Sequence, residues 1–315
     1  MKNITALPFL VIIFFLNIAD NPAFCQEQES KKERNYGFSL GTQFGFVHGQ
    51  TFEYVYPDGS TKGELYSELT WDTKPVFYYG LQFDFERIDL MSAPGFFASV
   101  SFKAGVPADS GFMEDRDWLS PENAALTHFS HSTNRTNEFY LLDAAAGASI
   151  PVKSYFYIKP FLNGAWMHFS FTARDGYYKY PEKEDRLYGE VIRYQQDWFL
   201  IAAGFYAGTK ILSPFYFGVS FQISPFTYCA ATDEHLDESK KMTFHDYTAW
   251  GLFLEPAGRV SFSHGRLEFS LETAWRYIGK TTGESYIDKN ANPDSHKAGA
   301  ALSLLDTRFF VKVRF

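Results

Sequence analysis

The chain ends in Thr307-Arg308-Phe309-Phe310-Val311-Lys312-Val313-Arg314-Phe315, and this stretch decides the expected fold. Aromatic or aliphatic residues at 309, 311, 313 and 315 alternate with basic residues at 308, 312 and 314. A period of two is typical of a β-strand whose two faces lie in different surroundings. We therefore expect the chain to end in a strand with one apolar and one charged face.

A terminal strand that finishes on Phe resembles the last strand of bacterial outer-membrane barrels, whereas the edge strand of a soluble sandwich has no special use for that Phe. Working backwards, the pattern predicts ten strands. An even number of strands places both ends of the chain on one side of a membrane. The expected spans are 36–55, 63–84, 95–106, 134–150, 154–175, 191–212, 215–232, 243–262, 265–282 and 298–315.

The connections between these segments alternate in length. Those near 151–152, 213–214 and 263–265 are tight, and those at 107–133, 176–190, 233–242 and 283–297 are longer and polar. Short turns of such barrels face the periplasm and long loops face outside. The sequence thus predicts an all-β fold, a ten-stranded antiparallel transmembrane β-barrel over 36–315 with long extracellular loops. Several strands exceed the roughly 9–11 residues of a membrane crossing, which predicts a barrel that rises above the membrane.

The N-terminus reads as a secretory signal peptide over residues 1–25. Lys2 precedes an apolar run at 6–18, and Ala23-Phe24-Cys25 forms a small-x-small cleavage site. A lipoprotein signal that uses Cys25 is disfavoured, because Phe24 stands where a small residue is needed. Residues 26–35 are strongly charged and are expected to be mobile. Together with the barrel pattern, this predicts the outer membrane of a Gram-negative-type bacterium, with the long loops outside.

Composition agrees with a barrel. Aromatic residues make up 19% of the chain, yet its mean hydropathy is only -0.24, as expected when apolar residues are needed only at alternate positions. The net charge of -8 disfavours a nucleic-acid partner. Ten strands leave little room for the channel of a porin. A closed barrel has no free edge that requires a partner, so we expect a monomer in contact with outer-membrane lipid.

Three polar clusters fall at the extracellular end of the expected strands, at 45–56, 113–118 and 232–237. Asp115 and Asp117 are two residues apart, as are Asp233 and His235, and residues two apart point to the same side of an extended backbone. An Asp beside a His orients it and makes it more basic. Facing carboxylates could then help to activate a water molecule. The alternative is that these carboxylates are simply solvated.

Other chemistry has weaker support. His128 and His131 lack an obvious third ligand for zinc, so no metal site is expected. Ser130 lies near these histidines, but it has no nucleophile-elbow sequence around it. Cys229, in an apolar and aromatic strand, is expected to be inert.

The chain resembles the omptin family of outer-membrane proteases from about residue 37 to residue 315. Asp115-Arg116-Asp117-Trp118 matches the family's Asp-x-Asp-Trp, and Asp233-Glu234-His235 matches its Asp-Glu-His. The stretch from Ser170 to Gly176 and Asn137-Glu138-Phe139 match structural positions. The resemblance implies an aspartic-type endopeptidase for peptide or protein substrates, without a cofactor, in which Asp233 and His235 activate water opposite Asp115 and Asp117.

The resemblance also implies a substrate pocket. Glu53 falls where the family has a glutamate that binds the basic side chain before the scissile bond, and Met113 falls near the adjoining subsite. The chain departs from the pattern at Ala231, where the family commonly has a second acid. Losing that carboxylate should weaken the selection of Arg or Lys.

A second departure concerns lipopolysaccharide, which the family uses as an activating lipid. At the matching positions on the outer wall the chain has Trp166, His168 and Asp197, the last in place of an Arg. An aspartate repels a lipid phosphate, which suggests a different lipid partner, or none. The competing functions are a non-enzymatic surface barrel, such as an adhesin or host-protein binder, and a lipid-modifying barrel hydrolase. The latter needs a Ser-His pair near the membrane, which the sequence does not show.

Overall fold

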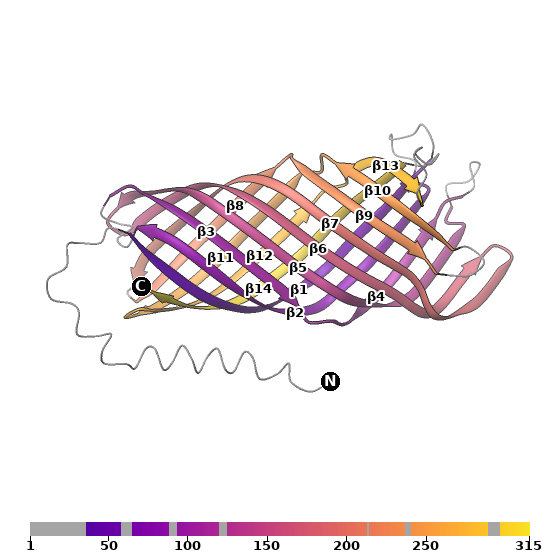
Figure 1. Cartoon of the computed structure of the whole chain (residues 1–315), viewed down its shortest axis with the longest axis horizontal. Coiled ribbons are helices and arrows are strands. Elements are labelled where there is room, and N and C mark those ends of the chain that lie inside the picture. The colour runs from indigo at the N-terminus through magenta and orange to yellow at the C-terminus, as the bar shows by residue number, and fades with distance from the viewer. Residues whose placement is uncertain are drawn as a thin grey trace.

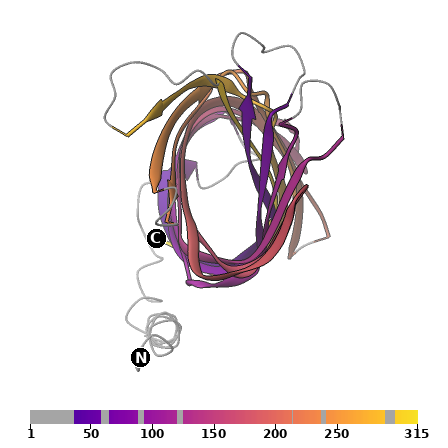
Figure 2. The ribbon, with the colours of Figure 1, turned by 90° about the vertical axis from the view of Figure 1, so that its right-hand side faces the viewer.

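The computed structural model describes residues 36–57, 65–87, 93–119, 125–212, 214–236, 241–288 and 297–315. Nearly all of them lie in antiparallel strands that close into one ring (Figures 1 and 2). The first and last strands pair from Ser39 with Arg314 to Tyr56 with Lys297. The expected antiparallel transmembrane barrel is thus confirmed. The expected signal peptide at 1–25 and mobile segment at 26–35 lie outside the described residues. No helix in the described ranges is long and apolar enough to cross a membrane.

The ring has ten strands, as expected, but four of them are interrupted once, so the described residues form fourteen segments. The interrupted strands are β3 with β4, β8 with β9, β11 with β10, and β12 with β13. Two interruptions contain Pro107 and Pro225, which have no backbone N–H for the sheet. The bounds are β1 Tyr36–Tyr56, β2 Ser67–Arg87, β3 Gly95–Gly105, β4 Ala108–Asp117, β5 His128–Lys153, β6 Phe156–Tyr180, β7 Lys183–Leu212, β8 Phe215–Ser224, β9 Thr227–His235, β10 Met242–Ala249, β11 Phe253–His264, β12 Leu267–Ile278, β13 Thr282–Ile287 and β14 Lys297–Arg314.

The terminal strand has the two faces that its sequence predicts. Phe309 is exposed on the outer surface, whereas Lys312 is buried inside the ring. On β2, Phe77, Leu81 and Phe83 are exposed in the same way. Apolar side chains on the outside of a membrane barrel lie against lipid. These residues mark the membrane-spanning half, which contains the start of β1 and the end of β14 (Figure 1).

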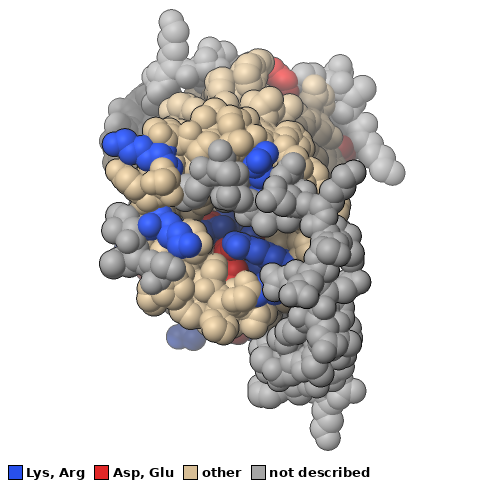
Figure 3. Space-filling model, turned by 90° about the vertical axis from the view of Figure 1, so that its left-hand side faces the viewer, with Lys and Arg blue, Asp and Glu red and all other residues tan. Residues whose placement is uncertain are grey.

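The lumen of this half is filled by ion pairs. Lys103 Nζ lies 2.6 Å from Asp306 Oδ2, and Lys312 Nζ lies 2.8 Å from Asp84 Oδ2. Lys, Arg, Asp and Glu side chains are visible inside the opening at this end of the molecule (Figure 3). They line a cavity of about 350 Å³. Because each buried charge lies beside an opposite charge, the interior can be polar without leaving a charge uncompensated.

The opposite half extends well beyond the membrane. β5, β6 and β7 contain 26, 25 and 30 residues, compared with the roughly 9–11 of one crossing. Residues assigned to loops at 107–133 and 176–190 are therefore largely strand: β4 runs through the first range, and β6 and β7 meet across a turn at 181–182. Beyond the membrane neither face of a strand touches lipid, so the apolar alternation that reveals a strand is not required there.

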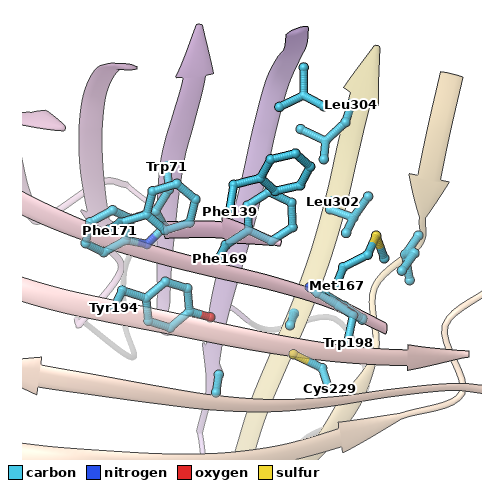
Figure 4. Close-up of a cluster of buried hydrophobic side chains, with 14 of the residues drawn as sticks. Trp71, Phe139, Met167, Phe169, Phe171, Tyr194, Trp198, Cys229, Leu302 and Leu304 are labelled. Atoms are coloured by element: carbon cyan, nitrogen blue, oxygen red, sulfur yellow. The ribbon is translucent and has the colours of Figure 1, made fainter. Parts of the chain in front are cut away.

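An apolar layer separates the two halves of the lumen. Along β1, Gln43 lines the polar cavity, Val47 belongs to the apolar layer, and Glu53 lies beyond it. The layer contains an aromatic stack in which the Trp71 ring lies 5.7 Å from Phe171 and 5.2 Å from Tyr194 (Figure 4). We refer to these three residues as the aromatic plug. It forms the floor beneath the extracellular end of the lumen.

Candidate active site

Asp233 and His235 lie on the luminal face of β9. This segment is paired on both sides, with β7 and with β10, so its backbone is fixed. Asp233 is only 3% exposed. His235 Nε2 lies 2.8 Å from Asp233 Oδ2, which is hydrogen-bonding distance. The expected contact between the two residues is therefore present in the structure.

Asp115 and Asp117 lie on β4, between β2 and β5. The Ser67 hydroxyl donates a 3.0 Å hydrogen bond to Asp115 Oδ1. Burial, followed by the charge of Asp117, raises the pKa of Asp115 to about 8, although the Ser67 hydrogen bond and His235 act in the opposite direction. A carboxyl with this pKa is mostly protonated at neutral pH and can donate a hydrogen bond.

The two pairs are near enough for their charges to interact. His235 lowers the pKa of Asp115 and Asp233 raises it, so β4 and β9 bring all four predicted residues to one end of the lumen. The arrangement combines a histidine held by a carboxylate with a carboxyl group that retains its proton. Such a set can remove a proton from water and can also donate a hydrogen bond to a developing oxyanion.

Glu53 enters the site from β1 and is 3% exposed. Burial raises its pKa well above the usual range, and the negative charges of Asp233, Asp246 and Asp115 add to this effect. Its Oε2 accepts no hydrogen bond within the described part of the chain. Met113 is fully buried in the apolar cluster that includes the plug. Met113 therefore belongs to the floor of the site.

Two residues near the site were missed from the sequence. Ser67 is the first residue of β2, and no motif in the sequence predicts its contact with Asp115. Asp246 is a luminal residue of β10; its cross-strand neighbour is Ala231, the position at which the chain departs from its expected pattern. That register could be read only from the structure.

The other candidates lie apart from this centre. The His131 ring contacts Phe112 at 4.6 Å, and that of His128 contacts Tyr180 at 4.4 Å. Within the described ranges, no three His, Cys, Asp or Glu side chains are arranged to hold a metal ion. Cys229 is a free, buried thiol in the apolar cluster.

Trp166, His168 and Asp197 form a cluster on neighbouring strands of the wall. Asp197 Oδ1 accepts a 2.9 Å hydrogen bond from Trp166 Nε1 and lies 3.0 Å from His168 Nδ1. His168 Nε2 also lies 3.6 Å from Glu138. The cluster thus contains two carboxylates that share one histidine.

One solved structure with a TM-score above 0.5 has this fold. The crystal structure of the outer-membrane protease OmpT from Escherichia coli matches with a TM-score of 0.78 and 19% identity, over 91% of this chain and 99% of that chain. The toluene transporter TodX from P. putida matches with a TM-score of 0.33 and 10% identity, over 90% and 91%. No curated protein is detectably similar in sequence. The model of the Omptin family matches residues 34–313. This outer-membrane β-barrel therefore belongs to the Omptin family.

Proposed function

We propose that this outer-membrane protease hydrolyses peptide bonds with a water molecule held between the Asp233–His235 dyad and the Asp115–Asp117 pair. The observation that carries the proposal is the 2.8 Å contact between His235 Nε2 and Asp233, opposite a carboxyl of raised pKa on β4. The same residues in a solvated rim would not need to be buried, and Asp233 is almost fully buried.

The geometry supports a general-base mechanism without a covalent intermediate. When the Nε2–H of His235 donates to Asp233, Nδ1 is the ring nitrogen that takes a proton from water. The hydroxide oxygen then adds to the peptide carbonyl, and the protonated Asp115 donates a hydrogen bond to the resulting oxyanion. The imidazolium finally gives its proton to the leaving amine as the C–N bond breaks. No residue changes its covalent state in this sequence.

The substrates that fit are peptides or unfolded protein segments, which are cleaved next to basic residues. The walls of the site carry Glu53, Asp115, Asp117 and Asp233, which are all acidic. A cationic side chain favours the ionised form of such groups and would be attracted to this end of the lumen. Glu53, buried beside Asp233, is the carboxylate we assign to a basic side chain next to the scissile bond.

We further propose that cleavage does not require lipopolysaccharide and that the protein acts as a monomer. Asp197 and Glu138 flank His168 on the wall. Two carboxylates at one histidine present a surface that repels a lipid phosphate. The strands of the described ranges close into a ring, which leaves no free sheet edge there that a second copy must cover.

A cleavage profile tests the mechanism. Refolded protein in detergent, with and without lipopolysaccharide, would be given a mixed peptide library, and the cuts would be read by mass spectrometry. We expect His235→Ala to lower cleavage by about 100- to 10,000-fold. His264→Ala, at the opposite end of the barrel, is the matched control and should retain full activity. Equal cleavage by His235→Ala and wild type would refute the mechanism. No cleavage by folded wild type under either lipid condition would favour the surface-binding barrel.

A further inference from the structure

The position at which this chain lacks an acid faces an acid on the next strand. Ala231 of β9 is paired directly with Asp246 of β10. Both are 5% exposed and lie on the luminal face. Side chains directly opposite each other in an antiparallel pair have Cβ atoms roughly 4.5–5.5 Å apart. The methyl group of Ala231 therefore leaves the space beside it to the Asp246 carboxylate.

Glu53 reaches the same region from β1. On its other side, Ala231 is paired with Gln196 of β7. The Nε2 of Gln196 donates a 3.1 Å hydrogen bond to the Phe52 carbonyl. This bond joins β7 to β1 across the barrel. Glu53, the next residue after Phe52, lies near enough to Asp246 for the two carboxyl groups to interact. Burial raises the pKa of Glu53 most, followed by the charge of Asp233 and then that of Asp246. Glu53 of β1 and Asp246 of β10 thus face one space in the lumen.

The surroundings of Glu53 point to a cationic ligand. Its Oε2 accepts no hydrogen bond in the described residues, although the side chain is almost wholly buried. The charged groups that act most strongly on it are the carboxylates of Asp233, Asp246 and Asp115. The phenol of Tyr194 also faces it. A buried carboxylate without a donor is costly unless a cation or a donor enters.

We propose that Asp246 is a specificity-determining residue, which with Glu53 forms a two-carboxylate pocket for the arginine or lysine side chain next to the scissile bond. This inference rests on the proposed function. It assigns to β10 the carboxylate that is missing at position 231. Charge-assisted hydrogen bonds from a guanidinium to two carboxylates are stronger than those of a neutral side chain.

The pocket should make the KM for an arginine peptide depend on pH. At low pH Glu53 is protonated, because its pKa is raised by burial and by the neighbouring carboxylates. The KM for an arginine peptide should fall as pH rises and Glu53 ionises. The KM for a citrulline peptide, its neutral counterpart, should not follow this change. Asp246→Asn removes one of the charges that raise the pKa of Glu53, so the fall in KM should move to lower pH.

The decisive comparison is the ratio of kcat/KM for the arginine and citrulline peptides. Asp246→Asn should lower this ratio by about 10- to 100-fold, mainly through KM, and should retain cleavage of the citrulline peptide. The double variant Ala231→Asp/Asp246→Asn, which moves the carboxylate across the strand pair, should restore the ratio. Glu284→Gln removes an acid of the neighbouring strand β13 whose side chain is 43% exposed and paired with Lys297, and should leave the ratio unchanged.

The outcomes separate the two proposals. An unchanged ratio in a folded Asp246→Asn protein, beside an active wild type, would overturn the role of Asp246 and leave the mechanism intact. Inactivity of folded wild type towards both peptides would overturn the mechanism and this inference together. If Asp246→Asn does not fold, the wild-type protein decides: KM values that respond equally to pH for both peptides would refute the pocket.

Discussion

Replacing Asp115 with asparagine should change stability and activity in opposite directions above neutral pH. Asparagine has nearly the same shape and can still accept the 3.0 Å hydrogen bond from Ser67. It does not titrate, whereas the pKa of Asp115 is raised to about 8 by burial and by Asp117. The variant therefore removes the ionisable carboxyl group of residue 115 and changes little else in the folded barrel.

The sign follows from proton binding. In the unfolded chain the Asp115 carboxyl ionises near its ordinary pKa of about 4, whereas in the barrel it holds its proton to about pH 8. Between these values the folded state binds more protons, so the wild-type barrel loses stability as pH rises. Below about pH 4 both states are protonated and the contribution is complete.

The magnitude has an upper limit. One pKa unit corresponds to about 1.36 kcal/mol, so the three units between pH 5 and pH 8 allow roughly 4 kcal/mol. Asp115 is only half-buried, and water at the rim reduces the cost of its charge. We expect the asparagine variant to gain roughly 2 kcal/mol over wild type between pH 5 and pH 9.

The assay is denaturant unfolding in detergent at pH 5 and pH 9, followed by tryptophan fluorescence, together with peptide cleavage. Asp115→Asn should be nearly as stable as wild type at pH 5, more stable at pH 9, and strongly impaired in cleavage at both. A stability difference that does not depend on pH would refute the protonated state of Asp115. Full cleavage by the variant would refute its role in the mechanism.

Further predictions concern the support of the site and the lumen. Ser67→Ala removes a hydrogen bond that lowers the pKa of Asp115, so the alkaline limb of the cleavage profile should move to higher pH; an unmoved limb would contradict this. Trp71→Ala should cost about 3–5 kcal/mol in unfolding and open an ionic conductance in planar bilayers, whereas a silent bilayer would show that the lumen remains closed. Lys103→Ala should cost about 3 kcal/mol, because Asp306 loses a buried partner, and cleavage per folded molecule should stay unchanged. A loss of activity without unfolding would show that the two ends of the lumen are coupled.

The membrane-spanning half was predictable from sequence because lipid imposes a rule on it. Residues 307–315 alternate since one face meets lipid and the other meets the charged lumen. The same rule gave the ten strands and their order. It failed at 107–133 and 176–190, where strands continue in water and no alternation is enforced.

The two-residue spacing predicted that Asp115 and Asp117 share one face of a strand, and likewise Asp233 and His235. The spacing did not predict that the two pairs form one site; only the resemblance to the family implied that. The pocket of Glu53 and Asp246 was only half predictable. Its two carboxylates are 193 positions apart in the chain and come together through the strand register of β9 and β10 and the closure of the ring. No short motif encodes the register between distant strands. Ala231 by itself indicated that the pocket lacks one carboxylate, whereas the structure supplies that carboxylate from Asp246.

The aromatic plug also has a consequence for the cell envelope. Trp71, Phe171 and Tyr194 stack across the lumen between the polar cavity and the site. A peptide that enters from outside therefore cannot continue inward, and both fragments must leave through the mouth by which the substrate arrived. The protein can degrade molecules at the surface without creating a leak for solutes into the periplasm. Substitutions on the rim can accordingly change what is cut while the permeability barrier of the outer membrane stays the same.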